Sequence, residues 1–170
     1  MKVEEILIVD GYNIIGAWSY LRELKMVDLF LARDGLIQMM VDYQSFSGRK
    51  VYIVFDAYDV PGKGSVENNN HVEIVFSKEN ETADEMIERL VNRLTNRWRR
   101  IYVATNDLVE QRVIFGQGAL RISSKELWRE VESNRKRLKG KVTNLATPKN
   151  RLSDNLSEEL KKFLENWRRQ

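Results

Sequence analysis

The sequence predicts an α/β fold in which a central, mostly parallel sheet is covered by helices on both faces. Three apolar runs rich in β-branched and aromatic residues support this prediction: residues 6–9, 51–55 and 101–105. Runs without polar alternation are typical of strands buried on both faces, as in parallel sheets. Two further candidate strands at residues 72–76 and 119–122 bring the expected sheet to about five strands.

Helix signals lie between these runs. Asp28 is a candidate N-cap, and apolar residues then recur at three- and four-residue steps until Gly48. This pattern predicts a helix between the first two strands, and residues 14–25 predict a shorter helix or turn before it. A strand, a helix and a second parallel strand form one right-handed crossover unit.

The segment between Asp56 and His71 is predicted to be a mobile loop, because it holds two glycines, one proline and three consecutive asparagines. Such a loop could form a flap over a site at the end of the second strand, or it could be an exposed connection. His71 is the single histidine of the chain and opens the next strand at the end remote from the acids, so it is not expected to be a catalytic base.

Three later helices are predicted to begin with capping boxes. The pairs are Thr82 with Glu85, Asp107 with Glu110, and Ser123 with Glu126. Residues 1–140 are expected to form one domain, and residues 141–170 a linker and an amphipathic helix that packs on it. The apolar residues of that last helix are Leu156, Leu160, Phe163, Leu164 and Trp167.

The composition excludes cysteine-based sites and indicates a single globular domain. A chain of 170 residues is long enough for one hydrophobic core. It has no cysteine, which excludes disulfides, thiolate zinc sites and a thiol nucleophile. Neither a signal peptide nor a membrane-spanning segment is evident, so a cytoplasmic protein without a membrane partner is expected.

Acidic residues follow the three main strand-like runs, because Asp10, Asp56 and Asp107 come at or just after their ends. Ligands bind at this edge of parallel sheets, and carboxylates gathered there repel one another unless a cation joins them. Mg2+ or Mn2+ is the candidate ion, because hard cations take oxygen ligands. Asp84 is expected to point toward this group, with Glu81 as an auxiliary. Turn and capping roles are the alternative explanation for each acid.

Charge is distributed unevenly along the chain. Residues 1–110 carry 13 Lys and Arg against 18 Asp and Glu, whereas residues 111–170 carry 15 against 7, a balance of +8. A basic surface beside a metal centre suits a polyanion, and Arg121, Lys125 and Arg129 are the candidate phosphate contacts. The alternative is a basic helix that is only solvated.

The chain resembles the YacP-like branch of the NYN domains, bacterial relatives of PIN-domain ribonucleases. The resemblance covers essentially the whole length and rests on five segments: Val9–Asn13, Phe55–Ala57, Glu79–Glu85, Thr105–Asp107 and Phe115–Ala119. It implies a PIN-like three-layer α/β sandwich and a metal-dependent endoribonuclease. It also implies an association with mRNA cleavage and with translating ribosomes.

In this resemblance Asp10, Asp56, Asp84 and Asp107 form the acidic cluster that holds Mg2+ or Mn2+, and Asn13 matches the asparagine after the first strand. Carboxylate-bound ions can position water and neutralise charge on a phosphodiester, so no side-chain nucleophile is needed. Asn13 and Thr105 would orient water or phosphate. Asn106 departs from the serine that the family pattern leads us to expect.

Two other functions compete with this one. A receiver-like phosphoacceptor domain would use Asp56 as its phosphorylated residue, but such a domain needs paired acids at the first strand and a lysine after the fifth. This chain has Asp10–Gly11 and Ile122–Ser123 at those places. The other alternative is a catalytically inactive module that binds RNA or the ribosome, against which the four retained acids argue.

Overall fold

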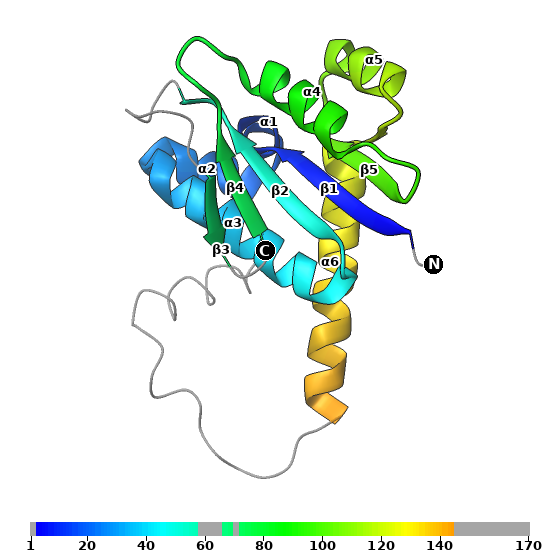
Figure 1. Cartoon of the computed structure of the whole chain (residues 1–170). Helices are drawn as coiled ribbons and strands as arrows, with labels where there is room; N and C mark the ends of the chain where they lie inside the picture. Colours follow the sequence, from blue (N-terminus) through cyan, green and yellow to red (C-terminus); the bar gives the residue numbers. More distant parts are fainter. Residues whose placement is uncertain (1–2, 58–65, 70–71, 145–170) are drawn as a thin grey trace. The chain divides into compact units, whose positions relative to one another are not determined.

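The computed structural model describes residues 3–57, 66–69 and 72–144 (Figure 1). Its elements, in chain order, are β1 (Glu4–Asp10), α1 (Gly11–Ala17), α2 (Ser19–Val27), α3 (Leu29–Ser47), β2 (Lys50–Phe55), β3 (Val66–Asn69), β4 (Val72–Phe76), α4 (Ala83–Leu94), β5 (Arg99–Ala104), α5 (Leu108–Gly116), β6 (Leu120–Ile122) and α6 (Ser124–Asn144).

The strands form one sheet in the order β3-β4-β2-β1-β5-β6. Every neighbouring pair is parallel except β3 and β4, which are antiparallel. The predicted α/β fold with a mostly parallel central sheet is therefore confirmed. β1 lies in the middle, with Asp10 opposite Val54 of β2 and Val9 opposite Ala104 of β5.

The edge strand β3 corrects the sequence prediction. Residues 57–70 are predicted to be loop throughout, yet Val66–Asn69 pairs with Val72–Val75 of β4. Edge pairing of this kind depends on the partner strand, so a polar segment with little strand propensity can still form it. The flap predicted for the rest of this segment falls mostly on residues 58–65, which lie outside the described residues.

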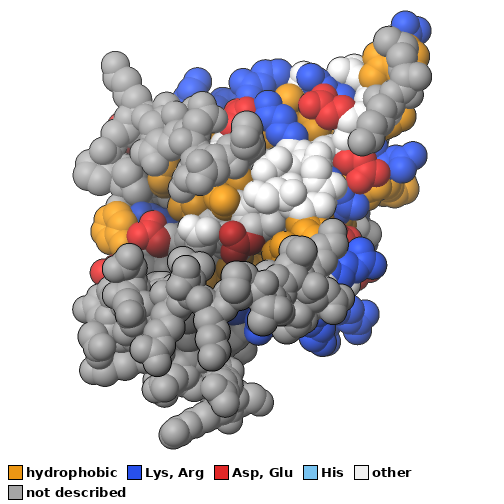
Figure 2. Space-filling view, turned by 90° about the horizontal axis from the view of Figure 1, so that it is seen from below, with side chains coloured by type: hydrophobic (Ala, Val, Ile, Leu, Met, Phe, Trp, Pro, Cys, Tyr) orange, Lys and Arg blue, Asp and Glu red, His pale blue; other side chains and the backbone are white. Residues whose placement is uncertain are grey.

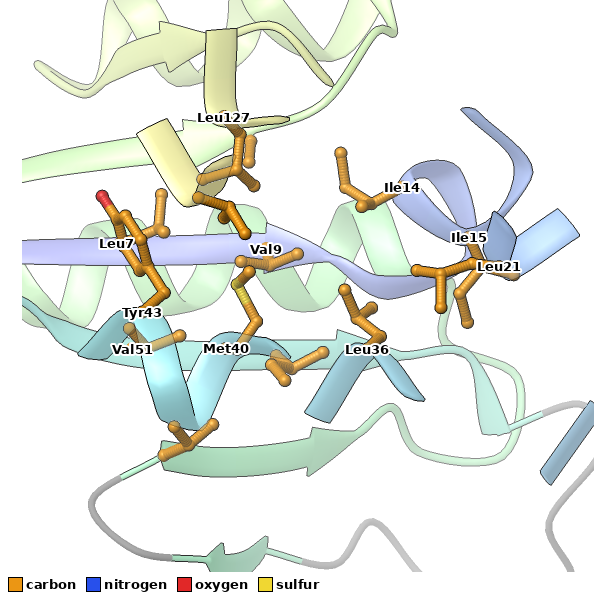
Figure 3. Packing of buried hydrophobic residues seen from close by; sticks show 14 of the residues in the cluster. Leu7, Val9, Ile14, Ile15, Leu21, Leu36, Met40, Tyr43, Val51 and Leu127 are labelled. Carbon is orange, nitrogen blue, oxygen red and sulfur yellow. The ribbon is translucent and has the colours of Figure 1, made fainter. Parts of the chain in front are cut away.

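Alternate residues of β1 face two separate hydrophobic layers. Leu7 and Val9 pack with α1, α2, α3 and α6, including Leu36, Met40 and Leu127, as Figure 3 shows. Ile6 and Ile8 pack on the other face with residues of α4 and α5. Side chains of a strand alternate between faces, so a sheet covered on both sides needs an unbroken apolar run.

The helix limits follow their predicted caps. Asp28 Oδ1 accepts a hydrogen bond from the Phe30 backbone N–H, and Gly48 ends α3 in the left-handed region at φ 70°. The capping box of Thr82 and Glu85 is complete at the start of α4. The Ser123 and Glu126 box is also present, because Glu126 accepts from the Ser123 N–H at 2.7 Å and Ser123 Oγ accepts from the Glu126 N–H at 3.2 Å.

Charges of both signs meet at the edge where the parallel strands begin. In the view of Figure 2, taken from below as the molecule stands in Figure 1, acidic and basic side chains are scattered over the described surface. The ion pairs at the strand starts join Arg49 with Glu5, Lys50 with Glu73, and Arg99 with Glu4, at 2.7–2.9 Å. This edge is balanced by ion pairs between neighbouring strands.

The chain divides into two compact units, Met1–Arg137 and Leu138–Gln170. Residues 141–144, where the linker is predicted to begin, form the end of α6. The rest of the predicted linker and amphipathic helix lies outside the described residues, so the packing of that helix on the domain stays a prediction. Within the described ranges, no helix is both long and apolar enough to cross a membrane.

Candidate functional site

Four predicted acids sit at or beyond the carboxyl edge of the sheet. Asp10 ends β1, Asp56 follows β2, Asp107 follows β5, and Asp84 lies in the first turn of α4, after β4. The chain builds β2 and β4 on one side of β1 and then crosses to build β5 on the other. Such a switch point is where open α/β sheets bind ligands, and Asp10 stands at it.

Asp10 is the buried member of this group, with 7% of its surface exposed. It is also the N-cap of α1, because its Oδ1 accepts a hydrogen bond of 3.4 Å from the Asn13 backbone N–H. Burial raises the pKa of the carboxyl to about 7, and the negative charges of Asp84, Asp107 and Asp56 contribute to this rise, against that hydrogen bond. Asp10 therefore changes its protonation near neutral pH.

Asp84, in the first turn of α4, also interacts with the charges of these acids. Burial raises its pKa, with additional contributions from Asp107, Asp56 and Glu85. The capping box explains Glu85, whose Oε2 accepts from the Thr82 N–H at 2.9 Å. It does not use Asp84, which lies between the two capping residues in the sequence. Strand-end acids and Asp84 are thus close enough for their charges to interact.

The four carboxylates are not arranged around a common metal position. Among the residues that the structure describes, no group of three or more His, Cys, Asp or Glu side chains is arranged to hold a metal ion. Their oxygen donors suit a hard divalent cation, and their mutual repulsion favours separation until a cation neutralises it. The donor chemistry therefore fits Mg2+ or Mn2+, with Asp10, Asp56, Asp84 and Asp107 as the residues that would hold it.

Hydrogen bonds of Asn13, Asn106 and Thr105 fix the backbone beside Asp10 and Asp107. Asn13 Oδ1 accepts a hydrogen bond of 2.9 Å from the Asn106 N–H, and Thr105 Oγ1 accepts one of 3.0 Å from the Asp107 N–H. Asn106 in turn holds the start of α6, since its side chain bonds both the N–H and the hydroxyl of Ser124. These contacts give Asn106 a structural role.

Gly11 permits a close approach directly beside Asp10. A Cβ atom at this position would lie 2.9 Å from the Val54 carbonyl oxygen and still closer to the Phe55 ring. Real Cβ atoms do not tolerate such distances, so the first turn of α1 can lie against β2 only with glycine here. The close approach predicted for this glycine is present.

The predicted auxiliary acid and the predicted phosphate contacts differ in how far other residues already engage them. Glu81 forms an ion pair of 2.7 Å with Arg89, and Arg121 Nε donates to the Thr105 carbonyl oxygen at 3.0 Å. Arg121 is therefore partly engaged by the strand that leads to Asp107. Lys125 and Arg129 are exposed on α6. Their contacts with RNA stay predictions.

Comparison with known proteins identifies the family. A model described as the YacP-like NYN domain matches residues 7–169, which is nearly the whole chain. The chain belongs to the YacP-like NYN domain family.

Individual relatives agree with this family. The chain is 50% identical over 165 residues to the "Uncharacterized protein YacP" of Bacillus subtilis (strain 168), covering 97% of each chain. The crystal structure of Rae1 (YacP) from Bacillus subtilis is similar with a TM-score of 0.75 and 50% identity, covering 96% of this chain and 94% of that one. The crystal structure of a mutant of that protein matches with a TM-score of 0.75 and 49% identity, covering 86% of each chain.

The fold of this YacP-like NYN domain is therefore nuclease-like and belongs with the PIN-like nucleases. Nucleases of this kind generally depend on divalent metal, which agrees with the oxygen donors at the sheet edge.

The sequence interpretation missed Arg33, Tyr12 and Phe30, which lie together beside this edge of the NYN domain. A signal was present in the spacing of α3. Leu29, Arg33, Leu36 and Met40 recur at steps of four and three, so Arg33 occupies a position that should be apolar.

Proposed function

We propose that this protein is a metal-dependent endoribonuclease, with mRNA on the ribosome as its substrate. The observation that carries the proposal is the coupling of buried Asp10 to Asp56, Asp84 and Asp107 at the switch point of a nuclease-like fold. A structural acid needs one partner or cap. Here burial raises the pKa of Asp10 and the charges of three other acids raise it further, and a substrate-associated cation would remove the cost of their repulsion.

Each residue has a defined task in this proposal. Asp10, Asp56, Asp84 and Asp107 would hold Mg2+ or Mn2+, which when bound activates water and neutralises charge on the phosphodiester. Asn13 joins the start of α1, beside Asp10, to the segment before Asp107, and Thr105 accepts a hydrogen bond from the Asp107 N–H. Lys125 and Arg129 on α6 would hold flanking phosphates, and Arg121 would do so beside the Thr105 carbonyl.

The test is cleavage of end-labelled mRNA by the purified protein, with and without ribosomes, in Mg2+, Mn2+ or EDTA. We expect internal cuts in either metal and none in EDTA. The Asp84→Asn variant, purified in parallel, controls for contaminating ribonucleases, because a contaminant would cut equally in both preparations. Equal cutting by both proteins, or cutting in EDTA, would overturn the proposal.

A second candidate is an inactive module that binds RNA or the ribosome. The balance of +8 over residues 111–170 would serve such a module equally well. The same experiment separates the two, because this candidate predicts retention of RNA or ribosomes without cuts in either metal. The receiver-like alternative is not retained, because the chain belongs to the NYN family.

A further inference from the structure

Arg33 of α3 is a buried cation beside the acidic edge. Only 5% of its surface is exposed. Its guanidinium donates to the Tyr12 hydroxyl from Nε at 2.7 Å and also from Nη2. Tyr12 lies in the first turn of α1, two residues after Asp10, so this contact links Arg33 to the helix that the buried acid caps.

Aromatic rings surround the same guanidinium. The Arg33 Cζ lies 5.3 Å from the ring centroid of Tyr12, 5.3 Å from that of Phe30 and 5.7 Å from that of Phe55. Phe55 directly precedes Asp56, and its ring centroid is 5.2 Å from that of Tyr12. The cation therefore lies against residues that neighbour two of the four acids.

The charge of Arg33 is not balanced by an acid within the described residues, where it forms no ion pair with a carboxylate. A neutral hydroxyl and three ring faces are weak compensation for burying a guanidinium, which is usually paired with an anion. The Nε and Nη2 donors meet on a single oxygen, so the fork that suits a phosphate or carboxylate is only partly used. This environment fits an anionic ligand.

Phe30 places an exposed aromatic ring beside the Arg33 guanidinium. It lies in the first turn of α3, and 65% of its surface is exposed although its ring packs on the Arg33 guanidinium. An exposed aromatic ring beside an arginine is the combination with which proteins hold single-stranded nucleic acid, since bases stack on the ring and the phosphate meets the cation.

We propose that Arg33 and Phe30 form a subsite for one nucleotide of single-stranded RNA next to the cleaved bond, with its phosphate at the guanidinium and its base on the Phe30 ring. This inference rests on the proposed function, because it takes RNA as the substrate. Tyr12 is a positioning residue in this subsite, since its hydroxyl orients the guanidinium.

The subsite lies on the α3 side of the edge, whereas Lys125 and Arg129 lie on α6. The two surfaces also differ in chemistry, because the subsite combines an aromatic ring with a cation. The exposed residues of α6 offer charge alone, which attracts any polyanion. Phe30 recognises a base, so the subsite predicts a preference for RNA with bases over a bare ribose-phosphate chain.

The experiment measures binding of a fluorescent single-stranded oligouridylate to the full chain by anisotropy in EDTA, in which the proposed function predicts no cleavage of the probe. We expect Phe30→Ala to weaken the affinity roughly five- to hundredfold, the range for loss of one stacked base. Arg33→Met should weaken it as well and make the dependence of log affinity on log salt less steep by about 0.7. Phe30→Trp should restore binding.

The chain provides a matched control at the opposite edge of the sheet. Trp98 is 43% exposed and has the Arg97 Cζ at 4.7 Å from its ring centroid, directly before the start of β5. The Trp98→Ala variant removes an exposed ring paired with an arginine, yet should leave RNA affinity unchanged. An abasic oligomer is the second control, because wild type and Phe30→Ala should bind it equally.

The outcomes separate the subsite from the proposed function. If wild type binds the oligouridylate and Phe30→Ala binds it equally well, the subsite is wrong and the proposed function stands. This holds even if Arg33→Met fails to fold, which would give Arg33 a purely structural role in joining α3 to α1. If wild type binds no oligouridylate, the subsite is overturned, and the cleavage assay with and without ribosomes decides the proposed function separately.

Discussion

The side-chain oxygen of Asn13 accepts a hydrogen bond of 2.9 Å from the backbone N–H of Asn106, across 93 residues of sequence. Asn13 follows the strand that ends in Asp10, and Asn106 directly precedes Asp107. This one bond therefore joins the start of α1, beside Asp10, to the segment before Asp107, at the carboxyl ends of the paired strands β1 and β5.

We expect Asn13→Ala to reduce RNA cleavage while the protein remains folded. The variant loses one hydrogen bond, worth about 1 kcal/mol of unfolding free energy, but frees the Asp107 loop relative to Asp10. Cleavage assays and thermal unfolding measure the two effects. The control is Asn96→Ala, which removes a similar bond to the Trp98 N–H at the other edge. Equal activity losses in the two variants would contradict a specific role for Asn13.

Divalent metal should stabilise the protein more at pH 8 than at pH 5. Burial raises the pKa of Asp10 to about 7, so this carboxyl is protonated at the lower pH and competes poorly for a cation. Saturating Mn2+ at about 100 times its Kd would add about 2.7 kcal/mol, or roughly 5–10 °C in melting temperature. Thermal melts with and without Mn2+ at both pH values provide the measurement. An unchanged midpoint at pH 8 in millimolar Mn2+ would count against a metal site.

Asp10→Asn is the control for that experiment, because it should abolish the extra stabilisation by Mn2+ at pH 8. Since the folded pKa of Asp10 lies above its ordinary value of 3.8, the folded state binds more protons between about pH 4 and 7. Asp10 therefore lowers stability as pH rises through this window, by up to about 4 kcal/mol. Without metal, Asp10→Asn should accordingly be more stable than wild type at pH 8, and equally stable near pH 4.

Asp84→Asn should lower RNA cleavage more than about a hundredfold and leave RNA binding intact, because an amide is a poorer metal ligand and brings no charge. Loss of the carboxylate from the first turn of α4 should cost at most about 1 kcal/mol through the helix dipole. Glu85→Gln is the matched variant, since glutamine can still accept from the Thr82 N–H. Comparable loss of cleavage in both folded variants would refute the separate roles of Asp84 and Glu85.

Lys125→Glu combined with Arg129→Glu should weaken RNA binding and reduce its salt dependence, because both side chains are exposed on α6 and would contact phosphates. Arg121→Glu is best tested separately, since Arg121 also donates to the Thr105 carbonyl and its loss disturbs the strand before Asp107. Filter binding over a salt series measures the slope. An unchanged slope in the double variant would show that this helix is only a solvated surface.

Gly11→Ala should destabilise the protein by about 1–3 kcal/mol, because its Cβ would overlap the Phe55 ring and approach the Val54 carbonyl. Gly16 lies in the same helix, but a Cβ atom added there would meet no atom of another element within 4 Å. Gly16→Ala should therefore be neutral or more stable by about 0.5–1 kcal/mol. Thermal unfolding of both variants tests this, and equal effects would contradict the close approach of α1 to β2.

Local chemistry in the sequence was sufficient for the five parallel strands and for the placement of acids at their carboxyl ends. Apolar runs that end in Asp10, Asp56 and Asp107 predict buried parallel strands and one shared edge, because strand burial and strand direction leave local patterns. The caps at Asp28 and Thr82 were predictable for the same reason, since a cap involves residues only two or three positions apart.

Tertiary structure decided the features that depend on residues distant in the sequence. The strand Val66–Asn69 forms because β4 offers it an edge, and the pKa of Asp10 rises because other elements bury it and bring Asp84 and Asp107 near. Likewise, Arg33 could be recognised as an unusual residue on an apolar face, but its contact with Tyr12 exists only once α1 and α3 pack together. Burial and long-range electrostatics are properties of the packed chain, so no local pattern encodes them.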